Sequence, residues 1–406
     1  MQNVSSSNSQ AVNVPKLRFP GFESEWEREK LRDFTERVVR KNKENETKLP
    51  LTISSKDGLV DQITYFNKQV SSKDMSGYYL LKKGEFAYNK SYSVGFDFGS
   101  IKRLDRYPMG ALSTLYICFA IKKHNSDFMK TYFDSLKWYK EIYMIAAEGA
   151  RNHGLLNVPT EDFFDTTHIL PQSETEQKKI AKFLLLLDER ITKQEQLVDS
   201  LKLYKRGALN SLFNRTLQFD KNATWVKKRI DEIFAERCER ASGNEQLLAV
   251  TINNGVQIRD AIDKKDNSSD DKNNYKKVYK GDIAYNTMRM WQGASGCSSF
   301  DGIVSPAYTV IFPIKKEEQN IIFWSFYFKD RELIKTFQKF SQGLTSDTWN
   351  LKYTQMASIR VFVPRYSEQC KIAEFLTSFD EKINCEESRL NHLQKLKHGL
   401  LNNMFV

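Results

Sequence analysis

The chain has 406 residues, of which 40% are hydrophobic, and it carries a formal net charge of +11 at pH 7. This length suits two or three domains, and the charge favours an acidic partner, although it also fits a soluble protein that is merely basic. No stretch of 18 apolar residues is present, and the five cysteines are scattered without a Cys-x-x-Cys pair. The composition argues against a membrane span, a disulfide framework and a zinc site, and it predicts a cytoplasmic protein with reduced thiols.

The first part of the chain predicts a mixed domain behind a short tail. Residues 1–15 are polar at their start and lack the apolar core of a signal peptide, which predicts a disordered N-terminus. Residues 16–172 combine a strand-like apolar run at 111–121 with helical spacing at 127–145. The regular alternation of a doubly wound sheet is missing, so an α/β domain of mixed character is expected.

A long amphipathic helix is predicted over residues 173–215. Its apolar positions alternate in steps of four and three, which forms a heptad seam that includes the polar Gln194. Thr175 stands where an N-cap is wanted, and Glu176 after it suits the positive end of the helix dipole. The predicted seam consists of Ile180, Leu184, Leu187, Ile191, Val198 and Leu201.

The same order returns in the second half of the chain. Residues 216–365 predict a second mixed domain, with a strand-like run at 303–312 and helical spacing at 321–340. A second long helix is predicted over residues 366–406, with Ser367 as its N-cap. Its seam, with Glu386 at the polar position, consists of Ile372, Leu376, Phe379, Ile383, Leu390 and Leu393.

Two sequence echoes indicate that the chain is a tandem repeat. Residues 176–183 return at 368–375, and residues 83–89 return at 280–286. The unit of about 200 residues is therefore a mixed domain followed by a long helix. A helix of roughly 38 residues is about 57 Å long and cannot bury its apolar stripe alone. We expect the two helices to pair as an antiparallel coiled coil with the domains at opposite ends; packing of each helix on its own domain is the alternative.

Signatures of catalysis are missing from the sequence. It contains no P-loop, no Gly-x-Gly-x-x-Gly after a strand and no Asn/Asp-Pro-Pro-aromatic tetrapeptide of amino-methyltransferases. The five histidines have no metal-ligand spacing. No catalytic residue, metal site or cofactor is therefore assigned to the chain, which favours a binding protein.

Three loops in each copy differ in sequence while the framework around them repeats. This pattern is expected if one scaffold carries two recognition surfaces of different specificity. Their side chains are of types that bind phosphates or base edges. The candidate DNA-binding residues are Ser54, Ser55, Lys56, Lys90, Tyr92, Arg151, Asn152, Thr251, Asn253, Asn254, Arg289, Trp291, Gln292, Thr345 and Ser346.

Some of these candidates suggest particular contacts. Arg289 and Gln292 are of the types that make two-pronged contacts to guanine and adenine. Tyr92 and Trp291 can stack or wedge, although packing suits Trp291 better than stacking. Every candidate is also of a type that serves as a scaffold residue in a surface loop. On the framework, Lys102 is a further candidate for a phosphate contact, together with the adjacent Arg103.

These features together resemble the specificity subunit of bacterial type I restriction–modification systems. The resemblance rests on the Glu-Gln-x-Lys-Ile-Ala segments at 176–181 and 368–373, on Pro-Lys-Leu-Arg-Phe-Pro-Gly-Phe at 15–22, and on Trp26. It covers the chain from about residue 13. The two Glu-Gln-x-Lys-Ile-Ala segments differ at one position, where the second copy has Cys370 and the first has Lys178.

The resemblance implies two target-recognition domains, each of which reads one half of a split double-stranded DNA sequence, with the helices as the spacer. It also implies a non-catalytic subunit that binds two methyltransferase subunits and recruits restriction subunits. S-adenosylmethionine, ATP and Mg would belong to those partners. The residues leave two alternatives open, a coiled-coil adaptor that joins protein-binding modules and a nuclease with an unrecognised active site. Salt-sensitive DNA binding and magnesium-dependent cleavage would discriminate among them.

Overall fold

The computed structural model describes residues 13–68, 70–146, 156–220, 224–242, 245–252, 254–262, 271–345 and 347–406. Most of the expected N-terminal tail lies outside these ranges. The described chain divides into two compact units, one drawn from residues 1–195 and 389–406 and the other from residues 196–388. None of the helices in these ranges is both long and apolar enough to cross a membrane.

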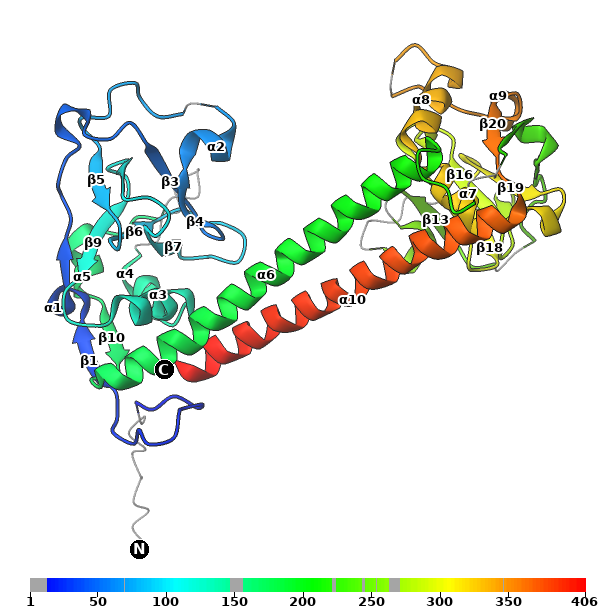
Figure 1. Ribbon diagram of the computed structural model, residues 1–406. Coiled ribbons are helices and arrows are strands. Elements are labelled where there is room, and N and C mark those ends of the chain that lie inside the picture. Colours follow the sequence, from blue (N-terminus) through cyan, green and yellow to red (C-terminus); the bar gives the residue numbers. More distant parts are fainter. Residues whose placement is uncertain are drawn as a thin grey trace, which may run out of the picture. The chain divides into compact units, whose positions relative to one another are not determined.

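The first unit combines two four-stranded sheets with a two-stranded ribbon within its described residues (Figure 1). The sheet orders are β2-β9-β6-β7 and β4-β3-β8-β5, and the ribbon pairs β1 with β10. Neighbouring strands are antiparallel except for the parallel pair β3 and β8. The strands are β1 (Glu27–Lys30), β2 (Thr35–Arg37), β3 (Pro50–Ser54), β4 (Gly58–Asp61), β5 (Tyr79–Lys82), β6 (Phe86–Asn89), β7 (Ser100–Arg103), β8 (Met109–Leu112), β9 (Ile117–Ile121) and β10 (Thr167–Leu170).

Two expected elements of the first unit are each divided in the structure. The apolar run at 111–121 forms the end of β8 and all of β9, because a turn closed by the Tyr116 N–H donating to the Ser113 carbonyl interrupts it. The expected helix at 127–145 is broken by Leu136, whose φ of 61° is left-handed. The helices are α1 (Leu31–Phe34), α2 (Gln62–Phe66), α3 (Ser126–Asp134), α4 (Tyr139–Ile145) and α5 (Thr160–Asp165), with a 3-10 turn at η1 (Lys43–Asn45).

The second unit repeats this framework. Its four-stranded sheet has the order β12-β19-β16-β17, which matches β2-β9-β6-β7, and its ribbon pairs β11 with β20. In addition, β13 and β14 form an antiparallel hairpin, and β15 pairs antiparallel with β18. The strands are β11 (Val226–Arg229), β12 (Phe234–Glu236), β13 (Leu248–Thr251), β14 (Gly255–Ile258), β15 (Lys276–Val278), β16 (Ile283–Asn286), β17 (Ser295–Cys297), β18 (Gly302–Val304), β19 (Tyr308–Pro313) and β20 (Arg360–Val363).

Corresponding interruptions occur in the second unit. The run at 303–312 divides into β18 and β19 at a turn where the Tyr308 N–H donates to the Ser305 carbonyl. The expected helix at 321–340 divides at Asp330, whose carboxylate caps the following helix by accepting from the N–H groups of Glu332 and Leu333. The helices are α7 (Ile321–Tyr327), α8 (Arg331–Phe340) and α9 (Tyr353–Ala357), with 3-10 turns at η2 (Ile230–Glu232), η3 (Arg259–Ala261), η4 (Met290–Gln292) and η5 (Lys316–Glu318).

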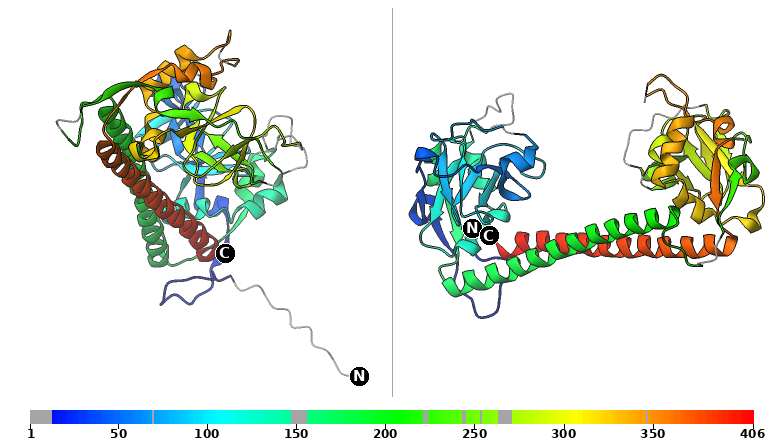
Figure 2. Two further views of the ribbon diagram at one scale, coloured as in Figure 1. Left: turned by 90° about the vertical axis from the view of Figure 1, so that its right-hand side faces the viewer. Right: turned by 45° about the horizontal axis from the view of Figure 1, so that its top comes forward.

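The two long helices are α6 (Glu174–Phe213) and α10 (Tyr366–Met404), and they lie alongside each other in antiparallel directions (Figures 1 and 2). In the first unit, Asp188 contacts Lys397 at 2.6 Å and Glu195 accepts from Gln394 at 3.3 Å. In the second unit, Lys202 and Lys205 pair with Glu387 and Asp380. Thus, within each unit, the α10 partner number falls as the α6 number rises. The expected antiparallel coiled coil is confirmed.

Burial along these helices follows the predicted seam. Eight seam side chains are buried, namely Ile180, Leu184, Ile191, Val198, Ile372, Leu376, Ile383 and Leu393. The other four, Leu187, Leu201, Phe379 and Leu390, are half-buried. At the polar positions, Gln194 is half-buried, whereas Glu386 is buried and pairs with Lys382 one turn earlier. The seam side chains are thus the buried or half-buried ones, as expected for heptad positions that face a partner helix.

The helix starts differ from the sequence expectation. Ser173, and not Thr175, caps α6, because its side-chain oxygen accepts from the Glu176 N–H at 3.3 Å. Helix α10 begins at Tyr366, so Ser367 lies within its first turn. Both predicted N-caps were therefore wrong by two residues, since Ser and Glu lie close together at both boundaries and several N-cap positions fit the sequence pattern.

The repeated Glu-Gln pair has a structural reason. The buried Gln177 donates to the Pro171 carbonyl at 2.7 Å and accepts from the Asn125 N–H at 2.8 Å. Gln369 makes the matching contacts, with the Pro364 carbonyl at 3.0 Å and the Asn320 N–H at 2.9 Å. Each glutamine therefore links the start of a long helix to the proline that follows a strand, β10 or β20. It also contacts the N-cap residue of a domain helix, α3 in the first unit and α7 in the second.

The preceding glutamates hold the segment that enters each domain. Glu176 is buried and accepts two bonds from Arg18, at 2.7 and 2.8 Å, and one from the Trp26 indole at 3.3 Å. Glu368, also buried, accepts from the Phe219 N–H at 2.8 Å. These carboxylates are structural anchors and not only companions of the helix dipole.

Each unit contains the start of one long helix and the end of the other. In the first unit, Phe405, the residue directly after α10, packs against Trp26, Phe128 and Tyr132, with ring centroids 5.7 to 6.2 Å apart. In the second unit, Phe213 from the end of α6 stacks on Tyr327 at 4.7 Å. The aromatic cores of both units therefore depend on side chains that are distant in sequence.

A histidine buried in the first core predicts an acid sensitivity. His168 bonds to Tyr132 and Thr166 through its two ring nitrogens, each at 2.9 Å, and burial lowers its pKa to about 3. An unfolded histidine takes up a proton near pH 6.5, whereas the folded one stays neutral, so the lowered pKa costs stability as the pH falls below 6.5.

We expect the first unit to lose about 2 kcal/mol of unfolding free energy between pH 7 and pH 5 from this group alone. Urea denaturation of the wild type and of His168→Gln at both pH values measures the difference. The variant should be weaker at pH 7 but less sensitive to acid. Equal pH dependence in both proteins would contradict the assignment.

Candidate nucleic-acid interface

The first and second loops of the first unit are joined by hydroxyl contacts. The Ser55 hydroxyl lies 2.8 Å from that of Ser93 and 3.0 Å from that of Ser100. Ser54 is buried and donates to Asp57 at 2.8 Å, so both serines act as scaffold. Lys56 at the tip of this loop is exposed. The structure thus brings the two predicted loops together and leaves Lys56 as the accessible candidate in the first.

The second loop of the first unit presents an aromatic and an aliphatic side chain to solvent. Tyr92 is 56% exposed, and Val94 next to Gly95 is 90% exposed. Lys90 is half-buried, and its carbonyl accepts from the Leu156 N–H at 2.9 Å. The sequence reasoning missed Val94, although an aliphatic residue between Ser93 and Gly95 is a usable signal. The candidates Arg151 and Asn152 of the third loop lie outside the described residues.

The first loop of the second unit is a tight turn. The Thr251 hydroxyl accepts from the Asn254 N–H at 3.1 Å and donates to the Gly255 carbonyl at 3.3 Å. Gly255 has a φ of 63°, and a Cβ there would lie 3.2 Å from the Gly296 Cα. Thr251 therefore serves the turn, and Asn254 is exposed at its tip. Asn253 lies outside the described residues.

In the second loop of the second unit, one candidate side chain is accessible to DNA and another packs against the protein. Arg289 is exposed, whereas the Trp291 indole donates to the Met288 carbonyl at 3.0 Å and its ring lies 5.2 Å from that of Trp349. Gln292 is half-buried in the 3-10 turn η4. Trp291 thus supports the loop, and Arg289 is the side chain that the loop presents.

The third loop of the second unit adjoins the second. The Leu351 N–H donates to the Thr287 carbonyl at 2.9 Å, and Trp349 contacts Trp291. Thr345 is exposed within this loop, and Ser346 lies outside the described residues. Beside both loops lies a pocket of about 320 Å³ whose lining includes Met288. Its other lining residues are Glu236, Lys276, Thr287, Pro306, Ala307, Thr309, Asn350, Lys352, Tyr353 and Thr354.

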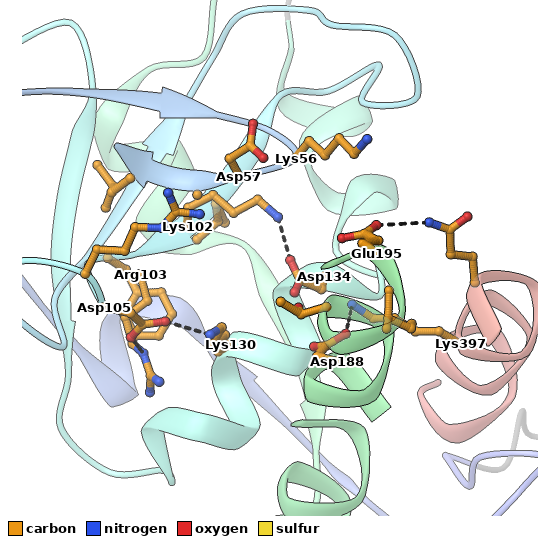
Figure 3. A pocket seen from close by; sticks show the side chains of 18 residues that line it. Lys56, Asp57, Lys102, Arg103, Asp105, Lys130, Asp134, Asp188, Glu195 and Lys397 are labelled. Carbon is orange, nitrogen blue, oxygen red and sulfur yellow. Dashed lines mark hydrogen bonds and ion pairs between the residues drawn. The ribbon is translucent and has the colours of Figure 1, made fainter. Parts of the chain in front are cut away.

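A charged groove of about 560 Å³ lies in the first unit between the sheet domain and the long helices (Figure 3). The domain side contributes Lys56, Asp57, Lys102, Arg103, Asp105, Lys130 and Asp134, and the helix side contributes Asp188, Glu195 and Lys397. The ion pairs among these lining residues stay within one wall each. Each wall is therefore only partly neutralised, because Lys56 on the domain side takes no part in these pairs.

The ion pairs within the groove determine which of its cations remain available to a ligand. Lys102 pairs with Asp134 at 2.6 Å, and Arg103 pairs with Asp105 at 2.7 Å. Burial opposes the ionisation of Asp105, but the bond from Lys130 and the nearby guanidinium outweigh it, and the pKa of Asp105 is lowered. Lys56 and the exposed Arg106 have no ion pair with any residue that the structure describes. The sequence reasoning missed Arg106, and it proposed two cations that carboxylates already hold.

Comparison with known proteins agrees with this framework. Residues 222–395 match the family model described as the type I restriction modification DNA specificity domain. The S subunit of a type I restriction–modification system from M. genitalium has a similar structure, with a TM-score of 0.56 and 14% identity over 97% of this chain and 99% of that chain. A chain from a structural study of complex assembly and conformational transition of the type I R-M system has a TM-score of 0.56 and 15% identity, over 96% of this chain and 99% of that chain.

The matched region and the fold point to the same class. Residues 222–395 match the type I restriction modification DNA specificity domain model, and the whole chain has a fold similar to that of an S subunit of a type I system. The resemblance drawn from the sequence is confirmed. The internal repeat extends the same framework to the first unit, because the strand order of its β2-β9-β6-β7 sheet is that of the matched region.

Proposed function

We propose that this protein is the sequence-specific DNA-recognition subunit of a type I restriction–modification complex. Each recognition domain reads one half of a bipartite site in double-stranded DNA, and the paired helices set the gap between the halves. The observation that carries this proposal is one framework that presents different side chains at equivalent loops. Asn89 and Asn286 end matching strands, yet Lys90 and Tyr92 follow the first, whereas Met288 and Arg289 follow the second.

The proposal assigns the chemistry to partner subunits. The chain itself is proposed to hold no cofactor and to catalyse no step. It assembles two methyltransferase subunits, which use S-adenosylmethionine, and restriction subunits, which use ATP and Mg. The specificity-domain family and the S-subunit fold support assembly into such a complex at the level of the class.

Arg289 offers a test confined to one half of the site. Replacing it with alanine should weaken binding to the cognate site by about 1–3 kcal/mol and relax one base position in one half only, because a two-pronged arginine contact discriminates among bases by this amount. The measurement is methylation mapping of the assembled complex together with binding to the mapped site.

Lys315→Ala is the matched control, because Lys315 is an exposed cation of the same unit that pairs with Glu318 at 2.9 Å. It should leave the methylated sequence unchanged. Relaxation of both halves by the arginine variant, or of neither, would contradict the assignment of this loop.

A further inference from the structure

One apolar side chain of the second unit is held in full solvent contact. Leu344 is 101% exposed, the highest value among the large hydrophobic side chains that the structure describes. It follows α8 and is flanked by Gly343 and the exposed Thr345. Single exposed leucines are common on protein surfaces, so the exposure of Leu344 matters only because of its place in a candidate recognition loop, where the side chain is available to a ligand.

The loop around Leu344 is closed by its own backbone. Gln342 and Asn350 exchange two N–H to carbonyl bonds, at 3.0 and 2.8 Å, and form the neck of the loop. Inside it, the Thr348 hydroxyl accepts from the Thr345 N–H at 3.1 Å, and the Thr348 N–H donates to the Thr345 carbonyl at 3.0 Å. These bonds hold the tip in shape without any contribution from the leucine side chain.

Gly343 permits the backbone path that leads to Leu344. Its φ of 140° is one that L-residues with a side chain rarely adopt, and a Cβ at this position would lie 2.6 Å from the Thr348 carbonyl oxygen. The loop therefore requires glycine at this position, directly before the fully exposed Leu344.

The neck of this loop packs against the second recognition loop of the same unit. Trp349 packs edge-on against Trp291, and the Leu351 N–H donates to the Thr287 carbonyl at 2.9 Å. The same loop presents the exposed Arg289, and Lys339 is exposed in the last turn of α8, just before the neck. Leu344 thus projects from a supported loop that adjoins a base-reading candidate and follows a cation suited to phosphate.

We propose that Leu344 is a wedge that inserts between two stacked base pairs of the target DNA and unstacks that step. The inference rests on the proposed function, since DNA is the occupant. Apolar side chains placed between base steps kink the duplex, and the cost of unstacking depends on the sequence of the step. Leu344 would therefore add to specificity through deformability, beside the direct contact of Arg289. The packed Trp291, which the sequence offered as a wedge, is not free for this role.

The test begins with methylation mapping by the wild-type complex, which supplies the target sequence. Duplexes with 2-aminopurine at successive positions of the half-site read by the second domain are then bound to the wild-type complex and to the Leu344→Ala complex. We expect fluorescence to rise at one step with the wild type, because 2-aminopurine brightens when unstacked. The variant should lose this rise, bind about tenfold more weakly and methylate with less preference for the base pairs of that step, while the rest of the site stays the same.

Two further variants sharpen the result. Leu344→Met keeps a long apolar side chain and should retain the fluorescence rise. Ile314→Ala truncates another exposed aliphatic of the same unit, 52% exposed, and should change neither fluorescence nor affinity. A wild-type complex without any unstacked step in this half-site would overturn the wedge, as would an unstacked step that persists in Leu344→Ala.

A different occupant would give a distinct pattern. If Leu344→Ala loses the methyltransferase during purification while its DNA binding stays intact, the leucine docks a protein and the wedge is overturned. If the wild-type complex methylates no chain-dependent sequence, the proposed function itself fails together with the wedge. That outcome is recognisable because it appears before any variant is measured.

Discussion

Phe405→Ala should lower the free energy of unfolding of the first unit by about 3–5 kcal/mol, the usual cost of truncating a buried phenylalanine. Its ring is 2% exposed and packs against three aromatic rings that come from the start and middle of the first domain. Phe213→Ala should do the same to the second unit, because Phe213 is 7% exposed and stacks on Tyr327.

Phe405→Ala should destabilise only the first unit, and Phe213→Ala only the second. Hydrogen exchange measured by mass spectrometry reports each unit separately, which matters because a protein of two units need not unfold in one step. Phe183→Ala is the control, since that ring is 40% exposed and should cost far less. Loosening of the second unit by Phe405→Ala, with the first unchanged, would contradict the exchange of helix ends between the repeats.

Glu176→Ala should cost the first unit about 3–5 kcal/mol, because it leaves the largely covered Arg18 guanidinium, 10% exposed, and the buried Trp26 indole without their acceptor. Glu174→Ala is the matched control on the same helix turn. Glu174 is exposed and pairs with Lys178 at 2.8 Å, so its loss should cost no more than about 0.5 kcal/mol. Thermal and urea unfolding followed by hydrogen exchange in the first unit measure both.

A double variant separates the two causes of the loss. Glu176→Ala with Arg18→Leu removes the orphaned charge as well as its partner, and it should recover part of the stability lost by the single variant. A double variant less stable than Glu176→Ala would show that the arginine contributes through packing and not through the ion pair.

The repeat made most of the framework predictable. Equal spacing in both copies predicted the paired helices, and the burial of Ile180 and Ile372 at equivalent positions follows from it. Breaks inside the domains were not predictable from periodicity. The left-handed Leu136 is an unusual backbone conformation for a leucine, and Asp330 caps a helix inside a continuous apolar pattern. Local hydrogen bonds decide such breaks, and spacing does not encode them.

The candidate loops were predictable as places but not as individual contacts. The sequence pointed to the loops after Asn89 and Asn286, and the structure brings each together with a neighbouring loop. It could not show that Ser55 is occupied by other hydroxyls or that Trp291 packs on Trp349. Such roles depend on residues more than 35 positions away in the chain, so only the folded protein assigns them.

Methylation mapping tests the central claim most directly. The chain is co-expressed with the methyltransferase subunit of its own system in a host without DNA methylation, and the genome is sequenced for modified adenine. The account predicts a two-part sequence with a fixed unspecified gap that appears only when this chain is present. A soluble complex that adds no chain-dependent methylation, or that methylates a single undivided sequence, would contradict it.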